Sequence, residues 1–420
     1  MNKSFFTQNR LNYLNQVNNN SLSLFFSGLV YPKSADEDYG FEVNKNFYYL
    51  TGINQANVIL TLVKRENKEK ITLFIEKNDP ILVKWVGAKL EIDEAKEISG
   101  IDDVRYLEDF DGFLFNLFNA TRVYEIKPDS LYLDLERRRD PYLINKETLF
   151  SQNFKKDYPE IAIRNSHEIV ISLRMIKTAE EISLIKESIN TTKGGIETLM
   201  REARPGLYEY QLESYFDQYI KYHGQKTHAF KTIAASGKNA TILHYVDNNE
   251  RMKAGELILF DLGARTDFYV SDISRTIPVD GKFMPRARLV YQEVLDVNKK
   301  CIEFLKPGIT WQDYNDYAKE LLTSALIRLG LIKDKTELQK YYYHNVGHFL
   351  GLDTHDPGSY ELVLKPGMAL TVEPGLYIEE EGIGVRIEDD VLITENGALN
   401  LSSDIIKEID DIEKFMAASK

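Results

Sequence analysis

An internal repeat in the second half of the chain constrains the fold more than any other feature. Segment 253–263 reads KAGELILFDLG and segment 365–375 reads KPGMALTVEPG, so the lysine, two glycines and an acidic residue fall at matching positions. In both copies the pattern is typical of a turn that leads into a strand ending at a carboxylate, Asp261 or Glu373. The repeat therefore predicts two copies of one supersecondary unit.

The repeat extends on both sides of these segments. Upstream, Arg-Pro-Gly-Leu at 204–207 and Lys-Pro-Gly-Ile at 306–309 each precede a helical pattern. Downstream, Asp272 and Glu388 each lie nine residues before a glycine. Two such halves, related by a pseudo-two-fold axis, are expected to bring four carboxylates together: Asp261, Asp272, Glu373 and Glu388.

The length of 420 residues predicts two domains, at roughly 100–200 residues per domain. The first part of the chain alternates a helical pattern at 91–98 with β-rich runs at 22–26, 47–50, 58–63 and 71–75. Thr178-Ala-Glu-Glu181 has the capping-box pattern and begins a helix with isoleucines along one face. The predicted fold class is α/β, with a small N-terminal domain over 1–170 and a second domain over 171–420.

Composition argues against several kinds of partner and location for this chain. The chain has 52 basic and 65 acidic residues and a net charge of −13, which disfavours nucleic acid and anionic membranes as partners. Its one cysteine, Cys301, lies in an apolar stretch and is expected to be a buried core residue. No segment has the pattern of a signal peptide or of a membrane span, so a cytoplasmic location is expected.

Four converging carboxylates require a counter-charge. One aspartate at a strand end, such as Asp261, is often only a turn residue, but buried like charges repel each other unless cations neutralise them. His348 lies between glycines in GHFLG, where the backbone can approach closely, and is expected to be a further ligand. This oxygen-rich donor set suits two divalent ions, manganese first, with cobalt, zinc and iron as alternatives.

These residues also match a known family. Asp261, Asp272, His348 in GHFLG, Glu373 in TVEPGLY and Glu388 in GVRIEDD resemble the five-ligand signature of the pita-bread metallopeptidases. That family includes aminopeptidase P, proline dipeptidase, methionine aminopeptidase and the metal-free creatinases. The N-terminal half resembles the α/β companion domain of aminopeptidase P and prolidase, through the motifs at 36–41 and 46–52. The resemblance thus covers nearly the whole chain.

The resemblance implies specific residue roles. Asp261 would bind one ion, His348 and Glu373 the other, and Asp272 and Glu388 would bridge the two. Glu373 would also be the general base. His244 and His355 resemble histidines that bind substrate and stabilise the reaction intermediate.

The resemblance marks further residues, each with an alternative reading. Arg386 would orient Asp261 or steer the peptide, or form a structural ion pair. His344 resembles another histidine of the family's motif and would contact substrate, or support neighbouring site residues or pack. Tyr377, which follows Glu-Pro-Gly-Leu, would line the pocket for proline, or pack in the core. In the N-terminal domain, Asp36 would bind substrate, and Trp85 would reach a neighbouring subunit's site or pack internally.

The resemblance leaves the substrate class to be decided. A dipeptidase must bind the free carboxylate of an Xaa-Pro dipeptide, typically with an arginine, and segment 356–367 contains none. We therefore expect hydrolysis of the Xaa-Pro bond in longer proline-containing peptides, by a homodimer or homotetramer. The alternatives are a prolidase, which could use Arg386 for the carboxylate, and a non-catalytic interaction protein of the same fold.

Overall fold

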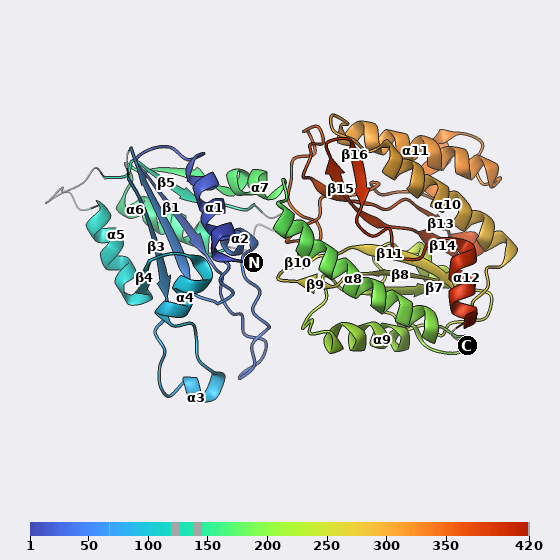
Figure 1. Cartoon of the computed structure of the whole chain (residues 1–420), viewed down its shortest axis with the longest axis horizontal. Coiled ribbons are helices and arrows are strands. Elements are labelled where there is room, and N and C mark those ends of the chain that lie inside the picture. Colours follow the sequence, from blue (N-terminus) through green and yellow to red (C-terminus); the bar gives the residue numbers. More distant parts are fainter. Residues whose placement is uncertain (67, 119–126, 138–144, 419–420) are drawn as a thin grey trace. The chain divides into compact units, whose positions relative to one another are not determined.

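A computed structural model describes residues 1–418 except 67, 119–126 and 138–144. The chain divides into two compact units, Met1–Arg174 and Met175–Lys420 (Figure 1). The first unit extends past residue 170 because helix α7 (His167–Arg174) belongs wholly to it. The Arg174 guanidinium donates to the Asn46 side chain at 2.8 Å within that unit.

The first unit is built on one mixed six-stranded sheet in the order β4-β3-β2-β1-β5-β6. Strands β1, β2 and β3 are antiparallel neighbours, whereas β4, β5 and β6 each pair in parallel. The strand bounds are Ser21–Phe26, Ile59–Arg65, Lys68–Ile75, Asp103–Tyr106, Ser130–Leu133 and Ala162–Asn165, from β1 to β6.

Helices cover both faces of this sheet. Even-numbered β1 residues pack with Phe110 and Phe154 of α5 and α6 in one aromatic core, while odd-numbered Phe25 contacts Tyr13 of α1 at 5.2 Å between ring centroids. A strand covered on both sides is apolar on both sides, and every β1 residue is buried. The helices are α1 (Lys3–Leu14), α2 (Lys45–Thr51), α3 (Val83–Val86), α4 (Ile92–Ser99), α5 (Phe110–Phe118), α6 (Lys146–Asp157) and α7.

One β-rich run predicted from the sequence is wrong. Residues 47–50 lie inside helix α2 rather than in a strand. The Asn44 side chain accepts a hydrogen bond from the Phe47 backbone N–H at 2.9 Å, and Gly52 ends the helix at φ +69°. These two capping residues outweigh the β propensity of the aromatic residues between them.

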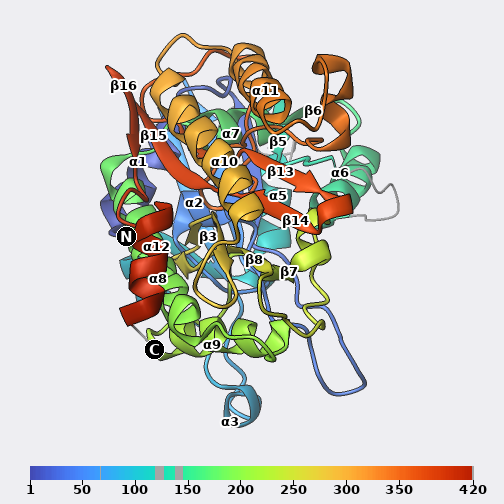
Figure 2. The same cartoon turned by 90° about the vertical axis from the view of Figure 1, so that its right-hand side faces the viewer.

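The second unit contains the repeat as two similar halves. In each half, two helices precede and cover antiparallel strands (Figures 1 and 2). The first half contains α8 (Ala179–Glu202), α9 (Glu209–Tyr222), β7 (Ile233–Ser236), β8 (Leu257–Leu262), β9 (Arg265–Thr266), β10 (Tyr269–Val270) and β11 (Ile273–Pro278). The second contains α10 (Pro285–Phe304), α11 (Trp311–Arg328), β12 (Ala369–Val372), β13 (Gly375–Ile378), β14 (Ile383–Arg386), β15 (Asp389–Thr394) and β16 (Gly397–Asn400), followed by α12 (Ile409–Ala418).

Strand pairing brings the carboxylate-bearing segments together. Strand β8 pairs with β11, so that Asp261 lies opposite Ser274, and β12 pairs with β15 in the other half. The halves join where the Glu388 backbone N–H donates to the Ser274 carbonyl at 3.1 Å. The expected capping box at Thr178 is present at the start of α8. Within the described ranges, none of the helices is both long and apolar enough to cross a bilayer.

Candidate metal centre

A cavity of about 280 Å³ lies in the second unit, where the two halves meet. Its lining includes all five residues expected to bind metal and all four of the expected histidine and arginine partners, His244, His344, His355 and Arg386. Its lining residues are Leu243, His244, Asp261, Asp272, His344, Asn345, Gly347, His348, His355, Tyr360, Glu373, Arg386 and Glu388.

Three of the expected ligands form one compact group. The possible ligand atoms of Asp272, His348 and Glu388 all lie within 4.8 Å of one another, and all three side chains are buried. Glu373 is adjacent, with its Oε1 3.7 Å from His348 Nε2. The convergence expected from the repeat is therefore present in the geometry.

The segment that carries His348 runs antiparallel beside β12. The Thr371 backbone N–H donates to the His348 carbonyl at 2.9 Å, and the Glu373 N–H donates to the Val346 carbonyl at 2.8 Å. A Cβ on Gly347 would lie 2.1 Å from the Thr371 carbonyl oxygen, so only glycine allows this approach. This glycine places the imidazole beside Glu373.

The carboxylates destabilise one another's charged forms. Burial and the neighbouring Glu388 and Asp261 raise the pKa of Asp272 well above its usual value. Burial, Glu373 and Asp261 do the same to the pKa of Glu388. Burial raises the pKa of Glu373 to about 8, against the lowering effect of Arg386. A divalent cation among these groups would remove the repulsion.

Hydrogen bonding at His348 supports a cation at this position. Its Nδ1 donates to the Phe349 carbonyl at 3.0 Å, which leaves Nε2 as an acceptor in the neutral ring, and burial lowers the His348 pKa to about 4. That Nε2 faces Asp272 Oδ2 at 3.4 Å. In addition, Asp261 Oδ1 is buried without a hydrogen-bond partner. Two acceptors that face each other, and a buried oxygen without a partner in the lining of the same cavity, fit a bound metal ion.

Arg386 is joined to the opposite side of the cluster. Its Nη2 donates to Asp261 Oδ2 at 2.6 Å, its Nε to Ser274 Oγ at 2.8 Å and its Nη1 to the Tyr377 hydroxyl at 3.1 Å. Ser274 in turn donates to Glu388 Oε2 at 2.8 Å. Burial would lower the Arg386 pKa, but Tyr377 and the nearby carboxylates raise it overall. The guanidinium thus holds one oxygen of Asp261 and leaves the other free.

The four expected substrate-side residues of this unit differ in exposure. His244 and His355 are exposed in the cavity, and the ring of His355 lies 4.0 Å from that of His348. The His344 Nδ1 donates to the Asn345 carbonyl at 2.7 Å, and its Nε2 accepts from the Tyr377 hydroxyl at 2.9 Å. Tyr377 itself is 2% exposed. Partners on both ring nitrogens favour the packing alternative for His344.

Asp36 and Trp85 belong to the first unit. Asp36 is exposed in the loop before α2, and Trp85 on α3 is 82% exposed, so Trp85 does not pack inside the first unit.

Sequence reasoning missed Ser274 and the lining residue Tyr360. Ser274 lies two residues after Asp272, and in an extended segment this spacing places two side chains on the same side, which was a usable signal. Nothing in the sequence distinguished Tyr360.

The raised carboxyl pKa values predict how metal-free protein responds to pH. Glu373 binds a proton more tightly folded (pKa about 8) than unfolded (pKa about 4.5), so this stabilisation is lost as pH rises through 8. We expect the Tm of chelator-treated protein to fall between pH 5 and pH 8.5, and added Mn²⁺ to raise Tm more at pH 8.5. Differential scanning fluorimetry measures both, and an equal Mn²⁺ effect at the two pH values would contradict the expectation.

Comparisons with known proteins agree with this geometry. Residues 183–395 match the profile of metallopeptidase family M24, and residues 6–124 match that of the aminopeptidase P N-terminal domain. The Xaa-Pro aminopeptidase of Haemophilus influenzae is 34% identical over 99% of this chain and 97% of its own length. Among solved structures, a candidate aminopeptidase P of Bacillus anthracis is 46% identical with a TM-score of 0.97, covering 100% of this chain and 99% of its own. Escherichia coli aminopeptidase P with the inhibitor Pro-Leu is 30% identical with a TM-score of 0.91 and the same coverage.

Proposed function

The chain belongs to metallopeptidase family M24 and carries the N-terminal domain of aminopeptidase P, and from this premise we propose how its site works. The protein is a metallo-aminopeptidase of the Xaa-Pro class, which removes the N-terminal residue from peptides with proline in second place. The observation that carries this assignment is the buried Asp272, His348 and Glu388 group, whose members line one cavity together with His244 and His355.

The donor set supports two divalent ions, manganese first. His348 and Glu373 would hold one ion, Asp261 the other, and Asp272 and Glu388 would bridge them. Bound ions lower the pKa of a shared water and polarise the scissile carbonyl. The side chain of Glu373 is 18% exposed, so it can pass a proton between this water and the substrate.

The substrate requires a proton donor on its leaving group. The proline nitrogen is a tertiary amide nitrogen in the peptide and must gain a proton before the bond breaks, a transfer that we assign to Glu373. His244 and His355 are exposed in the cavity and can donate hydrogen bonds to the carbonyl oxygen as negative charge develops. We assign Arg386 to the orientation of Asp261, since three of its nitrogens already have protein partners.

Arg386 already donates to Asp261, Ser274 and Tyr377, and this argues against the prolidase alternative, in which it would bind the substrate carboxylate. Arg386 is the only lysine or arginine among the described residues that line the cavity. A dipeptidase typically has an arginine in segment 356–367, and the residue of that segment that lines this cavity is the neutral Tyr360. The carboxylate of a bound Xaa-Pro dipeptide would therefore lack a free cationic partner. A non-catalytic protein is also disfavoured, because all five residues expected to bind metal line one cavity.

The test uses a tripeptide and a dipeptide. We expect chelator-treated protein reloaded with Mn²⁺ to release the first residue of an Xaa-Pro-Xaa tripeptide much faster than that of the matching Xaa-Pro dipeptide. Release of free amino acid, followed by chromatography, measures both rates. An Xaa-Ala-Xaa tripeptide is the control for the proline requirement. A faster rate on the dipeptide would favour a prolidase, and inactivity on both would favour a non-catalytic protein.

An exposed apolar patch supports the proposed homodimer or homotetramer. Four large side chains on and beside α3 are 54–82% exposed: Ile81, Leu82, Trp85 and Val86. Grouped apolar side chains of this size are typical of protein-protein contacts. The binding of substrate by Asp36 and a cytoplasmic location stay predictions from the sequence.

A further inference from the structure

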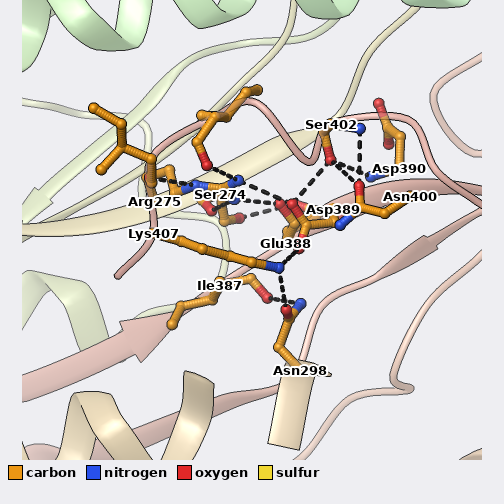
Figure 3. Close-up of polar contacts among 12 residues, drawn as sticks. Ser274, Arg275, Asn298, Ile387, Glu388, Asp389, Asp390, Asn400, Ser402 and Lys407 are labelled. Atoms are coloured by element: carbon orange, nitrogen blue, oxygen red, sulfur yellow. Dashed lines mark hydrogen bonds and ion pairs between the residues drawn. The ribbon is translucent and has the colours of Figure 1, made fainter. Parts of the chain in front are cut away.

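A buried polar network surrounds the backbone of Glu388 (Figure 3). We call it the rear network and define it as Arg275, Asn298, Asp389, Ser402 and Lys407. None of these residues lines the cavity, and four of them are at most 1% exposed: Arg275, Asn298, Asp389 and Ser402. Burying two cations and a carboxylate is costly unless each is fully paired, so the pairing of each member matters.

Arg275 is the centre of this network. On strand β11 its side chain points to the opposite face from that of Ser274, because successive side chains alternate. Its Nη1 donates to the Glu388 carbonyl at 2.5 Å and to the Ser274 carbonyl at 2.9 Å. Its remaining donors reach Asp389 Oδ1 at 2.9 Å and the carbonyls of residues 405 and 406 at 3.2 and 3.1 Å. One planar guanidinium therefore fixes three backbone segments, including that of Glu388.

Lys407 extends the network from Asp389 to helix α10. Its Nζ donates to Asp389 Oδ2 at 2.5 Å and to Asn298 Oδ1 at 2.8 Å. The Asn298 Nδ2 donates in turn to the carbonyls of Val372 at 3.1 Å and Ile387 at 3.2 Å. These two residues directly precede Glu373 and Glu388. The amide of Asn298 thus ties together the backbones that carry both glutamates.

Ser402, in the segment that follows β16, is a further partner of Asp389. Its Oγ donates to Asp389 Oδ1 at 2.9 Å and accepts from the Asp390 backbone N–H at 3.1 Å. Asp390 Oδ2 then accepts from the Asp272 backbone N–H at 3.1 Å. Through these bonds the chain after β16 reaches the backbone of a third expected ligand.

We propose that the rear network sets the spacing of the expected metal ligands Asp272, Glu373 and Glu388, and that Lys407 and Asn298 are positioning residues for the metal centre. The inference rests on the proposed function of that site. The network contacts the backbone of Glu388 and of the residue before Glu373 directly, and it reaches the Asp272 N–H through Asp390. None of its five side chains lines the cavity. Its loss should therefore change how the ligands are arranged without changing what the peptide contacts.

The test compares Lys407→Met with a matched control. Lys299→Met makes the same change on α10, where Lys299 forms an exposed ion pair with Glu408 at 2.7 Å. For Lys407→Met we expect Mn²⁺ affinity, measured against a chelating indicator, and kcat to fall about 10–100-fold, with KM within about twofold. The visible absorption spectrum of Co²⁺-loaded protein should shift. Lys407→Arg should recover most of each change, and Lys299→Met should match the unsubstituted protein.

The measurements separate positioning from general stabilisation. A lower Tm with unchanged affinity, Co²⁺ spectrum and kcat would overturn the proposal. If Lys407→Met does not fold, Ser402→Ala removes one hydrogen bond to Asp389, and a several-fold loss of Mn²⁺ affinity is then expected. Unchanged affinity in a folded Ser402→Ala protein would likewise count against it. Failure of the proposed function is distinguishable, because the unsubstituted protein would then neither bind Mn²⁺ nor cleave the tripeptide.

Discussion

Asp272→Asn is expected to abolish stoichiometric metal binding and to lower kcat/KM on an Xaa-Pro-Xaa tripeptide about 10³-fold or more. Asp272 is 5% exposed, and its Oδ2 lies 3.4 Å from His348 Nε2. The amide keeps the size of the carboxylate and the backbone bond to Asp390, but it removes the charge and one of the two oxygens that would bind metal. Loss of several kcal/mol of transition-state stabilisation corresponds to this rate effect.

The same variant gives a second, independent readout. Burial and the neighbouring carboxylates raise the pKa of Asp272 well above its usual value in the metal-free protein, so its carboxyl keeps its proton to a higher pH than an exposed aspartate. The neutral amide should therefore leave the Tm of metal-free protein nearly unchanged, while Mn²⁺ no longer raises it. Asp267→Asn is the control, since Asp267 lies at φ +45° in an exposed turn that asparagine tolerates. Full metal content in Asp272→Asn would contradict the assignment.

Arg386→Met is expected to lower the free energy of unfolding by about 3–5 kcal/mol, the usual cost of removing one partner from a buried ion pair. Arg386 is 3% exposed, and its loss leaves Asp261, Ser274 and Tyr377 without their donor. Asp261 would then face the other carboxylates without a nearby cation. Urea unfolding of metal-free protein measures the stability change.

A charge-retaining variant tests whether the geometry of Arg386 matters. Arg386→Lys keeps the charge but cannot reach Asp261, Ser274 and Tyr377 with separate nitrogens. We expect it to regain part of the stability and little of the tripeptide activity. Tyr377→Phe, which removes only the hydroxyl partner of Arg386 and His344, should have a smaller effect on both. Full activity of Arg386→Met would show that Asp261 needs no orienting partner.

Much of the site follows from local sequence patterns. The repeat places each acidic residue at a strand boundary, and strands that pair within each half bring such boundaries together. The two halves nevertheless pair differently. In the first half, Asp261 is itself paired, with Ser274 on the neighbouring strand. In the second half the last pair is Val372 with Asp389, so Glu373 and Glu388 both lie one residue outside the paired region. Spacing alone did not give this difference, because register depends on the hairpin between the strands.

Predictions from local sequence patterns failed where helix caps or contacts between distant residues determine the structure. Residues 47–50 have strand-like composition, but the Asn44 cap and Gly52 make them a helix. The segment order also gives no sign that Lys407 meets Asn298, which lies 109 positions earlier. Long polar side chains bind whichever partners the packed elements present, and those partners are set only when the elements assemble.

The sequence by itself determined the family, the two-half architecture and the residues expected to bind metal, because the repeat and the five ligand contexts are short-range patterns. Tertiary structure alone decided which atoms meet. It placed Ser274 between Arg386 and Glu388 and gave Arg386 the Tyr377 hydroxyl as a further partner. It also built the rear network around the backbone of Glu388. These contacts depend on how the strand pairs β8–β11 and β12–β15 and the segment after β16 pack around one buried cluster of charged groups. The spacing of residues along the chain does not determine that packing.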